Sequence, residues 1–409
     1  MRLKLLVCIL VVLGAPAFLA HAAEKPKVRA VTAFVRIDRA NYRAQVQEAL
    51  TMLRGAKAAF EKAGYEVQSI RIATQPVGNY TRGLSTADAV AFFQEYEKLA
   101  KAEGFDASIG PAMFARDSDP QEADLLADVL SKNLLLNASL TVADENGVRW
   151  GAVQAAARVM KRLQQETPGG IANFNFAAAA LVRPHTPFFP AAFHDGPGHR
   201  FAIALQSANV VAEAFASAKN PGEARENLEV ALGAHARAIE SVAQQAAKET
   251  GWQYMGIDLS PAPMREVSIG GAFERLPGTK FGSSGTMTAA AAVTAALAAI
   301  PVQHAGYSGL MVPVLEDSVL AERWSEGTLT MDALLAYSAV CGTGLDTVPL
   351  PGDVTVEQLA RVIGDMASLA VKLRKPLSAR LMPVSGKKPG DRTEFNDPFL
   401  VNATIQRLP

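Results

Sequence analysis

The stretch that decides the fold is VRAVTAFVRI at residues 28–37, followed after a helical pattern by YEVQSIRIA at residues 65–73. Both segments are rich in β-branched and aromatic residues, which is typical of strands. Between them, apolar residues recur at helical spacing from Val46 to Phe60, and Gly64 supplies a left-handed helix end. Because two strands joined by a helix of this length pair in parallel, the stretch predicts a β–α–β unit.

The same alternation continues along the rest of the chain. Further strands are predicted at 106–110, 133–142, 173–182, 200–206, 253–259, 309–315 and 378–384. Further helices are predicted at 85–104, 120–132, 147–166, 208–250 with an interruption near 220–222, 283–300, 331–340 and 355–375. Strands separated by such helices indicate an α/β fold with parallel pairing. No proline-rich or charged linker interrupts the pattern, so a single domain over residues 24–409 is expected.

The N-terminus has the organisation of a secretory signal peptide. A short basic start is followed by an apolar run over residues 5–19 and by Ala20-His21-Ala22-Ala23, a small-x-small cleavage site. The run is shorter than the roughly 20 apolar residues that span a bilayer. We therefore expect residues 1–23 to be removed and the mature protein to be periplasmic or secreted; an uncleaved N-terminal anchor is the alternative.

Composition narrows the classes of partner. The chain has 40 Lys and Arg against 40 Asp and Glu, and no basic patch points to nucleic acid. No later segment reaches membrane length, so no membrane contact is expected after signal cleavage. Removal of Cys8 with the signal leaves Cys341 alone, which excludes an internal disulfide. The expected partner is a small molecule; the cofactor is unknown, and a homo-oligomer stays open.

One pattern occurs twice. GIDLSPAP at residues 256–263 and GLDTVPLP at residues 344–351 both read Gly-apolar-Asp-x-x-Pro-x-Pro, and the prolines hold each segment extended. If both leave the same end of the fold, Asp258 and Asp346 face one cavity, where paired carboxylates can exchange protons. The alternative is a chance likeness of proline-rich loops in which each Asp stabilises a turn.

These segments also carry a resemblance to a known family. GIDLSPAP, SAVCGTGLDTVPLPGD at residues 338–353, GLMVPVLEDSVLAERW at 309–324, ARLMPVSGKKPGD at 379–391 and the N-terminal VRAVTAFVRID resemble the domain-of-unknown-function family 711. That family is similar to the pyruvate formate-lyase barrel, and the likeness covers nearly all of the chain after the signal. It implies a closed barrel of about ten strands with outer helices and an inserted loop. The family has no settled activity, so it assigns no catalytic residue here.

The resemblance to pyruvate formate-lyase stops at the radical site. The radical enzymes carry a glycine in an Arg-Val-x-Gly-aromatic loop near the C-terminus, where this chain has Asn396-Asp397-Pro398-Phe399-Leu400. We therefore expect the barrel as a scaffold without a glycyl radical. Because most relatives are intracellular, the signal peptide marks an exported variant.

Two residues outside the repeated motif are candidates for catalysis. Cys341 lies between a predicted helix and Gly342-Thr343-Gly344, where a thiol of lowered pKa would be a nucleophile. The alternative is a buried packing residue, since free cysteine is among the most buried residue types. His194 is a candidate acid or base. With Asp195 and His199 it also forms a weak candidate metal site, although the spacing fits no standard signature and a polar loop over the cavity is the alternative.

Two further groups are candidates for ligand binding. Ser283, Ser284, Gly285 and Thr286 open a predicted helix, where free amides and hydroxyls bind anions or act as helix caps. Two carboxylates are also candidates by position. Glu316 ends a predicted strand, where it suits either a ligand site or a helix cap, and Asp353 follows the second proline-rich motif.

Together these features favour an exported enzyme that acts on a small polar or anionic molecule by acid–base or thiol chemistry, without a radical. Its predicted catalytic residues are Cys341, Asp258, Asp346 and His194. A non-catalytic periplasmic small-ligand-binding protein is the alternative, since the same cavity would serve it. A scaffold that only assembles would lack an enclosed polar cavity.

Overall fold

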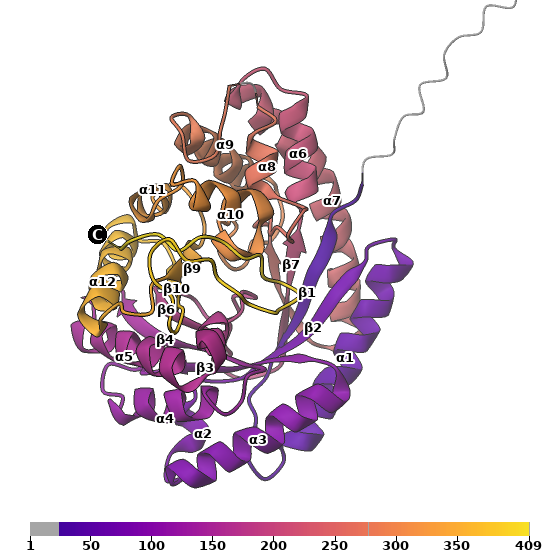
Figure 1. Cartoon of the computed structure of the whole chain (residues 1–409). Coiled ribbons are helices and arrows are strands. Elements are labelled where there is room, and N and C mark those ends of the chain that lie inside the picture. Colours follow the sequence, from indigo (N-terminus) through magenta and orange to yellow (C-terminus); the bar gives the residue numbers. More distant parts are fainter. Residues whose placement is uncertain (1–23, 277, 409) are drawn as a thin grey trace, which may run out of the picture.

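The computed structural model describes residues 24–276 and 278–408, in which strands and helices alternate (Figure 1). The predicted signal peptide lies outside the described residues. The strands are β1 (Lys27–Phe34), β2 (Val67–Ala73), β3 (Asp106–Ala112), β4 (Leu136–Asp144), β5 (Gly147–Val148), β6 (Phe176–Ala180), β7 (Arg200–Gln206), β8 (Gln253–Asp258), β9 (Gly344–Leu350) and β10 (Leu377–Pro383). The α-helices are α1 (Tyr42–Lys62), α2 (Gly78–Thr81), α3 (Thr86–Glu103), α4 (Gln121–Leu130), α5 (Trp150–Glu166), α6 (Ala208–Ala216), α7 (Pro221–Thr250), α8 (Ile269–Phe273), α9 (Thr286–Ala299), α10 (Ser318–Ser325), α11 (Met331–Tyr337) and α12 (Val356–Leu373); η1 (Pro168–Asn175) and η2 (Val314–Glu316) are 3₁₀ helices.

The strands of the described residues form one mixed sheet of ten strands, which confirms the α/β class and the expected strand count. Their order is β8-β7-β1-β2-β3-β4-β6-β10-β9, with β5 paired to β4. The central block β1-β2-β3-β4-β6 is parallel throughout. The pairs β7–β8 and β9–β10 are each parallel internally but join that block antiparallel, through β1 and β6. The predicted parallel pairing therefore holds within each block but not at the two junctions.

Hydrogen bonds between strands do not close this sheet into a barrel, because β8 and β9 are the two ends of the path among residues 24–276 and 278–408. The segment 304–313 lies against both ends. Isolated parallel bridges join Ile257 of β8 to His304, and Pro313 to Asp346 of β9. The gap between the two ends is thus lined by an irregular segment rather than by a strand.

The prediction of a strand at 309–315 is wrong, because this segment is irregular. Backbone amides in this stretch bond to hydroxyl groups instead of a neighbouring strand: Gly309 N donates to Ser260 Oγ at 3.2 Å and Leu310 N to Thr294 Oγ1 at 3.4 Å. The chain then enters η2 directly after Pro313. Apolar residues in this segment are buried without forming a ladder, which a hydrophobic pattern alone does not distinguish from a buried strand.

The second proline-rich motif was expected to be an extended loop, and it forms β9, in which every residue is buried. Gly344 has φ 95°, and a Cβ there would lie 2.4 Å from Ser378 O of β10, so only glycine allows this approach. The predicted start of α3 is confirmed, because Ser85 accepts a hydrogen bond from Asp88 N. Helix α1 ends as predicted, before the left-handed Gly64 (φ 81°).

The helices surround the strands in Figure 1, and the C-terminal segment, yellow, crosses in front of the sheet. One hydrophobic core runs from Val28 to Ile405 and includes the inward faces of α1, α5 and α12. None of the helices in the described part of the chain is both long enough and apolar enough to cross a membrane.

Candidate functional site

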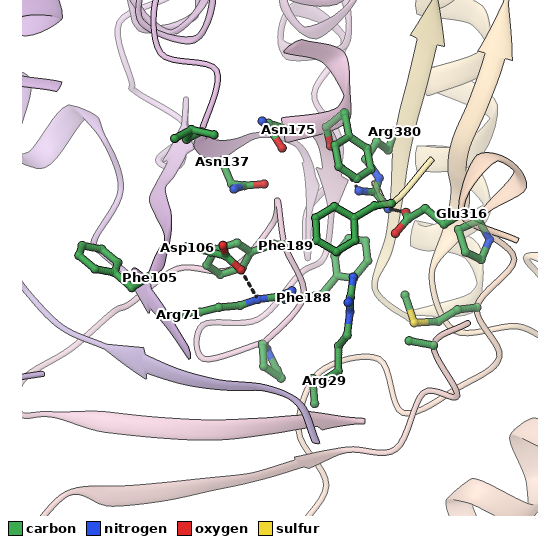
Figure 2. A pocket seen from close by; sticks show the side chains of 18 of the residues that line it. Arg29, Arg71, Phe105, Asp106, Asn137, Asn175, Phe188, Phe189, Glu316 and Arg380 are labelled. Carbon is green, nitrogen blue, oxygen red and sulfur yellow. Dashed lines mark hydrogen bonds and ion pairs between the residues drawn. The ribbon is translucent and has the colours of Figure 1, made fainter. Parts of the chain in front are cut away.

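A cavity of about 400 Å³ lies against the sheet, and its lining combines aromatic rings with charged side chains (Figure 2). Strands of the central block and of both flanking pairs, β7–β8 and β9–β10, contribute to its wall, together with the loop after β6, the segment around η2 and the C-terminal segment. The aromatic residues of the lining are Phe105, Phe174, Phe188, Phe189 and Phe399. The ionisable residues of the lining are Arg29, Arg71, Lys101, Asp106, Asp258, Glu316, Arg380 and Asp397.

Two β-bulges aim arginines at this cavity. In the β1–β7 pairing Val28 lies opposite Leu205 and Ala30 opposite Ala204, so Arg29 is an extra residue without a partner on β7. In the β9–β10 pairing the single residue Arg380 lies opposite two residues of β9. Bulges re-aim side chains and are frequent beside functional sites. The sheet irregularities thus coincide with the charged positions of the cavity wall.

Arg380 joins two carboxylates on one side of the cavity. Its Nε donates to Asp346 Oδ1 at 2.6 Å, and its Nη2 forms an ion pair with Glu316 Oε1. Its guanidinium also stacks on two rings of the lining, with centroids 5.0 Å and 5.7 Å away. Burial alone would lower the pKa of Arg380, but the two carboxylates outweigh it and raise that pKa. Arg380 is therefore a fixed cation held by its neighbours.

Glu316 is the acidic group of this cluster that reaches the cavity. Only 12% of its side chain is exposed. Burial raises its pKa, the charge of Asp346 adds to this, and Arg380 acts in the opposite direction. A carboxyl group of raised pKa beside a cavity is suited to exchanging a proton with a ligand.

Arg71 forms a second, more open pair. Its Nε lies 3.3 Å from Asp106 Oδ2, and its guanidinium stacks on Phe189 with 4.8 Å to the ring centroid. Burial lowers the pKa of Arg71, and Asp106 partly offsets this. Because half of the Asp106 side chain is exposed, this pair lies where the cavity opens to solvent.

Arg29 differs from the other two arginines because it forms no ion pair with any residue of the described chain. Its Nη1 donates a long hydrogen bond of 3.4 Å to Gln68 Oε1, and its guanidinium stacks on Phe399 at 5.3 Å. Burial, followed by the repulsion of Arg71, lowers its pKa to about 10, so it stays charged at neutral pH. A partly buried cation without an anionic partner is incompletely compensated, and an anionic ligand would supply the missing charge.

The repeated Gly-x-Asp motif contributes to the cavity in two ways. Asp258 lines it, and its carboxylate accepts backbone hydrogen bonds of 3.0 Å each from Ser260, Tyr307 and Ser308. Burial raises the pKa of Asp258, while these hydrogen bonds lower it. All its bonds in the described chain hold the adjoining loops, as expected for the turn-stabilising alternative.

Asp346 is buried behind the wall of the cavity, where it orients Arg380. Its second oxygen, Oδ2, has no hydrogen-bond partner within the described residues. Burial raises the pKa of Tyr307, and the charges of both Asp346 and Asp258 contribute to the shift. The two motifs therefore converge on Tyr307, although only Asp258 lines the cavity itself.

Cys341 lies outside this lining and is 1% exposed. Burial raises the pKa of its thiol, which Lys375 and nearby hydrogen bonds oppose only in part. A neutral, buried thiol favours the packing alternative over the nucleophile. Its catalytic role stays a prediction.

The histidine loop does not bring its candidate metal ligands together. His194 Nδ1 lies 3.3 Å from His185 Nε2, whereas the His199 ring lies against Trp252 and 3.3 Å from Glu48. Asp195 accepts a bond from the amide of the next residue. Across residues 24–276 and 278–408, no three His, Cys, Asp or Glu side chains are grouped to hold a metal ion.

The remaining predicted ligand residues lie away from the cavity lining. Ser283, Ser284 and Gly285 are exposed before α9, whose N-cap, Gly285, has no side chain to cap the helix. The buried Thr286 accepts a hydrogen bond at 3.1 Å from Gly282 N, an amide that precedes the helix. Asp353 is exposed in the loop after β9. Of the predicted residues, Asp258 and Glu316 line the cavity and Asp346 supports it.

Sequence reasoning missed the three arginines. Each lies inside a strand that is largely buried: KVRAVTAF in β1, VQSIRIA in β2 and LSARLMP in β10. Charged residues are seldom buried without a partner, so this pattern was an available signal. The aromatic pair Phe188-Phe189 also lines the cavity and lies in the same loop as the predicted His194.

The fold and site define an α/β protein with a mixed ten-stranded sheet and an arginine- and phenylalanine-lined cavity. The chain belongs to the family described as Uncharacterised ACR (DUF711), which matches residues 21–396. A UPF0210 protein of Pyrobaculum arsenaticum is 32% identical over 353 residues, which cover 81% of this chain and 76% of the relative. UPF0210 proteins of Ruminiclostridium cellulolyticum and Neisseria gonorrhoeae are each 27% identical, covering 81% and 83% of this chain and 77% and 79% of the relatives.

Proposed function

We propose that the protein is an enzyme that binds a small organic anion in the cavity and transforms it by acid–base chemistry, without a radical. The observation that carries the proposal is Arg29, a cation on the cavity wall whose charge no described carboxylate pairs. A carboxylate or similar group of the ligand would accept hydrogen bonds from this guanidinium in a planar, two-pronged geometry.

The lining also supports a ligand with a flat apolar part. Phe174, Phe188, Phe189 and Phe399 each have an arginine guanidinium over the ring, so aromatic and cationic side chains are paired on the cavity wall. Its volume of about 400 Å³ is within the range of small-molecule sites. Such a wall suits an unsaturated or aromatic acid better than a fully hydrated ion.

Glu316 is the residue we assign to proton transfer. It lines the cavity, its pKa is raised by burial, and Arg380 fixes its position. In this arrangement Arg29 would bind the anionic group, Arg380 would stabilise the ionised form of Glu316, and Glu316 would exchange a proton with the ligand. Asp346 would act through Arg380 as a positioning residue.

The first experiment is a calorimetric titration with small carboxylic acids, each paired with its neutral amide; benzoate and benzamide are one such pair. The acid is expected to bind and the amide is not, because only the acid supplies a charge for Arg29. Equal binding of acid and amide would contradict an anion site.

Turnover is tested next with the acid that binds best, by following its NMR spectrum in the presence of the protein. Glu316→Gln is expected to lower the rate by at least about 100-fold, the usual contribution of a general acid or base, while the affinity is kept. Binding without any product in the unaltered protein would favour the alternative, a non-catalytic small-ligand-binding protein.

We also propose that the protein is exported, on the basis of the signal-like pattern of residues 1–23, and that it is a single-domain relative of the pyruvate formate-lyase barrel. The bridges of segment 304–313 to β8 and β9 support a barrel closed by an irregular segment. Export is tested by N-terminal sequencing of the protein recovered from outside the cytoplasm. A mature N-terminus near residue 24 is expected, and an intact Met1 would contradict cleavage.

A further inference from the structure

A second hollow lies at the opposite end of β1 from the cavity. It measures about 440 Å³ and is lined by the residues that follow β1 and β2, with one residue from the first turn of α1. These are the carboxyl ends of two adjacent parallel strands. Crevices outside the carboxyl ends of strands are where α/β sheets commonly bind ligands.

The floor of this hollow is held by buried hydrogen bonds. Gln75 is 3% exposed; its Oε1 accepts from Ile37 N at 3.0 Å, and its Nε2 donates to Ile37 O at 2.7 Å. Tyr80 OH donates to Ile109 O at 2.7 Å and lies 3.1 Å from Thr74 Oγ1. The loop after β1 is therefore fixed against the end of β2.

The rim of the hollow carries three exposed arginines, Arg36, Arg39 and Arg82. None of them forms an ion pair within residues 24–276 and 278–408, whereas the nearby Arg43 pairs with Glu95 at 3.4 Å. The carboxylate of the lining belongs to Asp38, which forms hydrogen bonds with neighbouring residues of its loop.

The Asp38 carboxylate accepts hydrogen bonds from groups of its own loop. Its Oδ1 accepts from Ala40 N at 2.8 Å and from Asn41 Nδ2 at 3.4 Å. Gln45, in the first turn of the 21-residue helix α1, also lines the hollow. The positive end of that helix therefore adds to the charge of the three arginines.

We propose that this hollow binds the phosphoryl group of a small phosphorylated molecule. Arginine guanidinium groups match phosphate oxygens with paired hydrogen bonds, and three of them converge here without a carboxylate partner. The hollow presents few apolar side chains, so it lacks the aromatic wall that characterises the cavity. Arg29 and Arg36 are seven positions apart on an extended segment, which places the two sites roughly 20 Å from each other.

The test is a calorimetric titration of the purified protein with pyrophosphate at physiological salt. Saturable binding is expected. Arg39→Gln and Arg82→Gln are each expected to weaken it at least about tenfold, because a hydrogen bond between charged groups is lost. Arg43→Gln is the matched control; it removes the same charge from the same region without altering the lining, and the affinity should change little.

A parallel titration with ADP separates the sources of the phosphoryl group. Tighter binding of ADP than of pyrophosphate would identify a nucleotide, and equal binding would show that the phosphoryl group alone is recognised. The proposal is overturned if pyrophosphate does not saturate, or if Arg43→Gln weakens binding as much as Arg39→Gln. It is also overturned if Arg29→Gln abolishes binding, since the anion would then occupy the cavity.

Discussion

Two neighbouring regions of the molecule differ in the charge state of their buried ionisable groups. On the cavity wall, Arg380 stays charged between Glu316 and Asp346. In the loop after β6, burial lowers the pKa of His185 and of His194 to about 4, so both are neutral at pH 7. The same loop carries phenylalanines into the cavity, so the two regions are parts of one structure.

This difference in charge indicates which of the two regions is the better candidate for binding a small molecule. The histidine loop is held by hydrogen bonds to its backbone: His194 N donates to Thr74 O at 2.9 Å, and Ser108 Oγ donates to Ala192 O at 2.7 Å. The rings of His185 and His194 meet edge-on, with centroids 5.3 Å apart. The cavity wall holds Arg29, a cation that no carboxylate of the described residues pairs. Glu316 lines the cavity and His194 does not, and for this reason the proposed proton transfer is assigned to Glu316.

Arg380→Met makes the largest expected change. It removes the cation between Glu316 and Asp346 and leaves two buried carboxylates without a partner, which should cost about 3–5 kcal/mol of unfolding free energy. Urea unfolding measures the loss. Arg71→Met is the matched control, because Asp106 is half exposed and can be hydrated. Equal losses for the two variants would contradict the distinction between a buried cluster and an open pair.

The histidine pair predicts a pH dependence of stability. Their folded pKa of about 4 lies below the unfolded value of 6.5, so the unfolded chain binds more protons between these values. The unfolding free energy should therefore fall as the pH drops from about 6.5 to about 4, by on the order of 3 kcal/mol per histidine. Urea unfolding at several pH values tests this.

The double variant His185→Gln/His194→Gln separates this effect from that of the carboxyl groups. Burial raises the pKa of Asp258 and of Glu316, which favours the folded state at low pH and so acts in the opposite direction. The variant should lose the decline between pH 6.5 and 4. The same slope in both proteins would show that the histidines do not cause it.

The smallest expected effect concerns Cys341, a third buried ionisable group. Because its thiol is buried and its pKa is raised, iodoacetamide should label it at least about 100-fold more slowly in the folded protein than in urea. Rapid labelling of the folded protein, with a pH midpoint below the free-thiol pKa of about 8.5, would instead support Cys341 as a nucleophile.

The sequence predicted most elements because buried parallel strands and amphipathic helices leave clear patterns. The two errors at the ends of the sheet have one cause. The segment 309–315 is apolar yet bonds to hydroxyl groups, and β9 contains Gly344 and Pro349 yet pairs with β10. Which of two buried segments forms a ladder depends on their neighbours in space, which residue patterns do not encode.

The site was less predictable than the fold. The repeated motif singles out Asp258, which lines the cavity, and Asp346, which lies behind its wall. It does not show that Asp258 holds loops while Asp346 orients Arg380. The arginines became significant only when bulges and stacking rings brought them together from distant strands. Convergence of this kind is a property of the three-dimensional arrangement.

The most direct test of the central claim compares the affinity of the best-binding carboxylate for the unaltered protein, Arg29→Gln and Arg39→Gln. Arg29→Gln should weaken binding about 10- to 100-fold, the worth of charge-assisted hydrogen bonds, without loss of stability, because it removes an unpaired cation. Arg39→Gln, with the same charge change outside the cavity, should bind as the unaltered protein does. Unchanged affinity in Arg29→Gln would contradict the assignment of the cavity as the anion site.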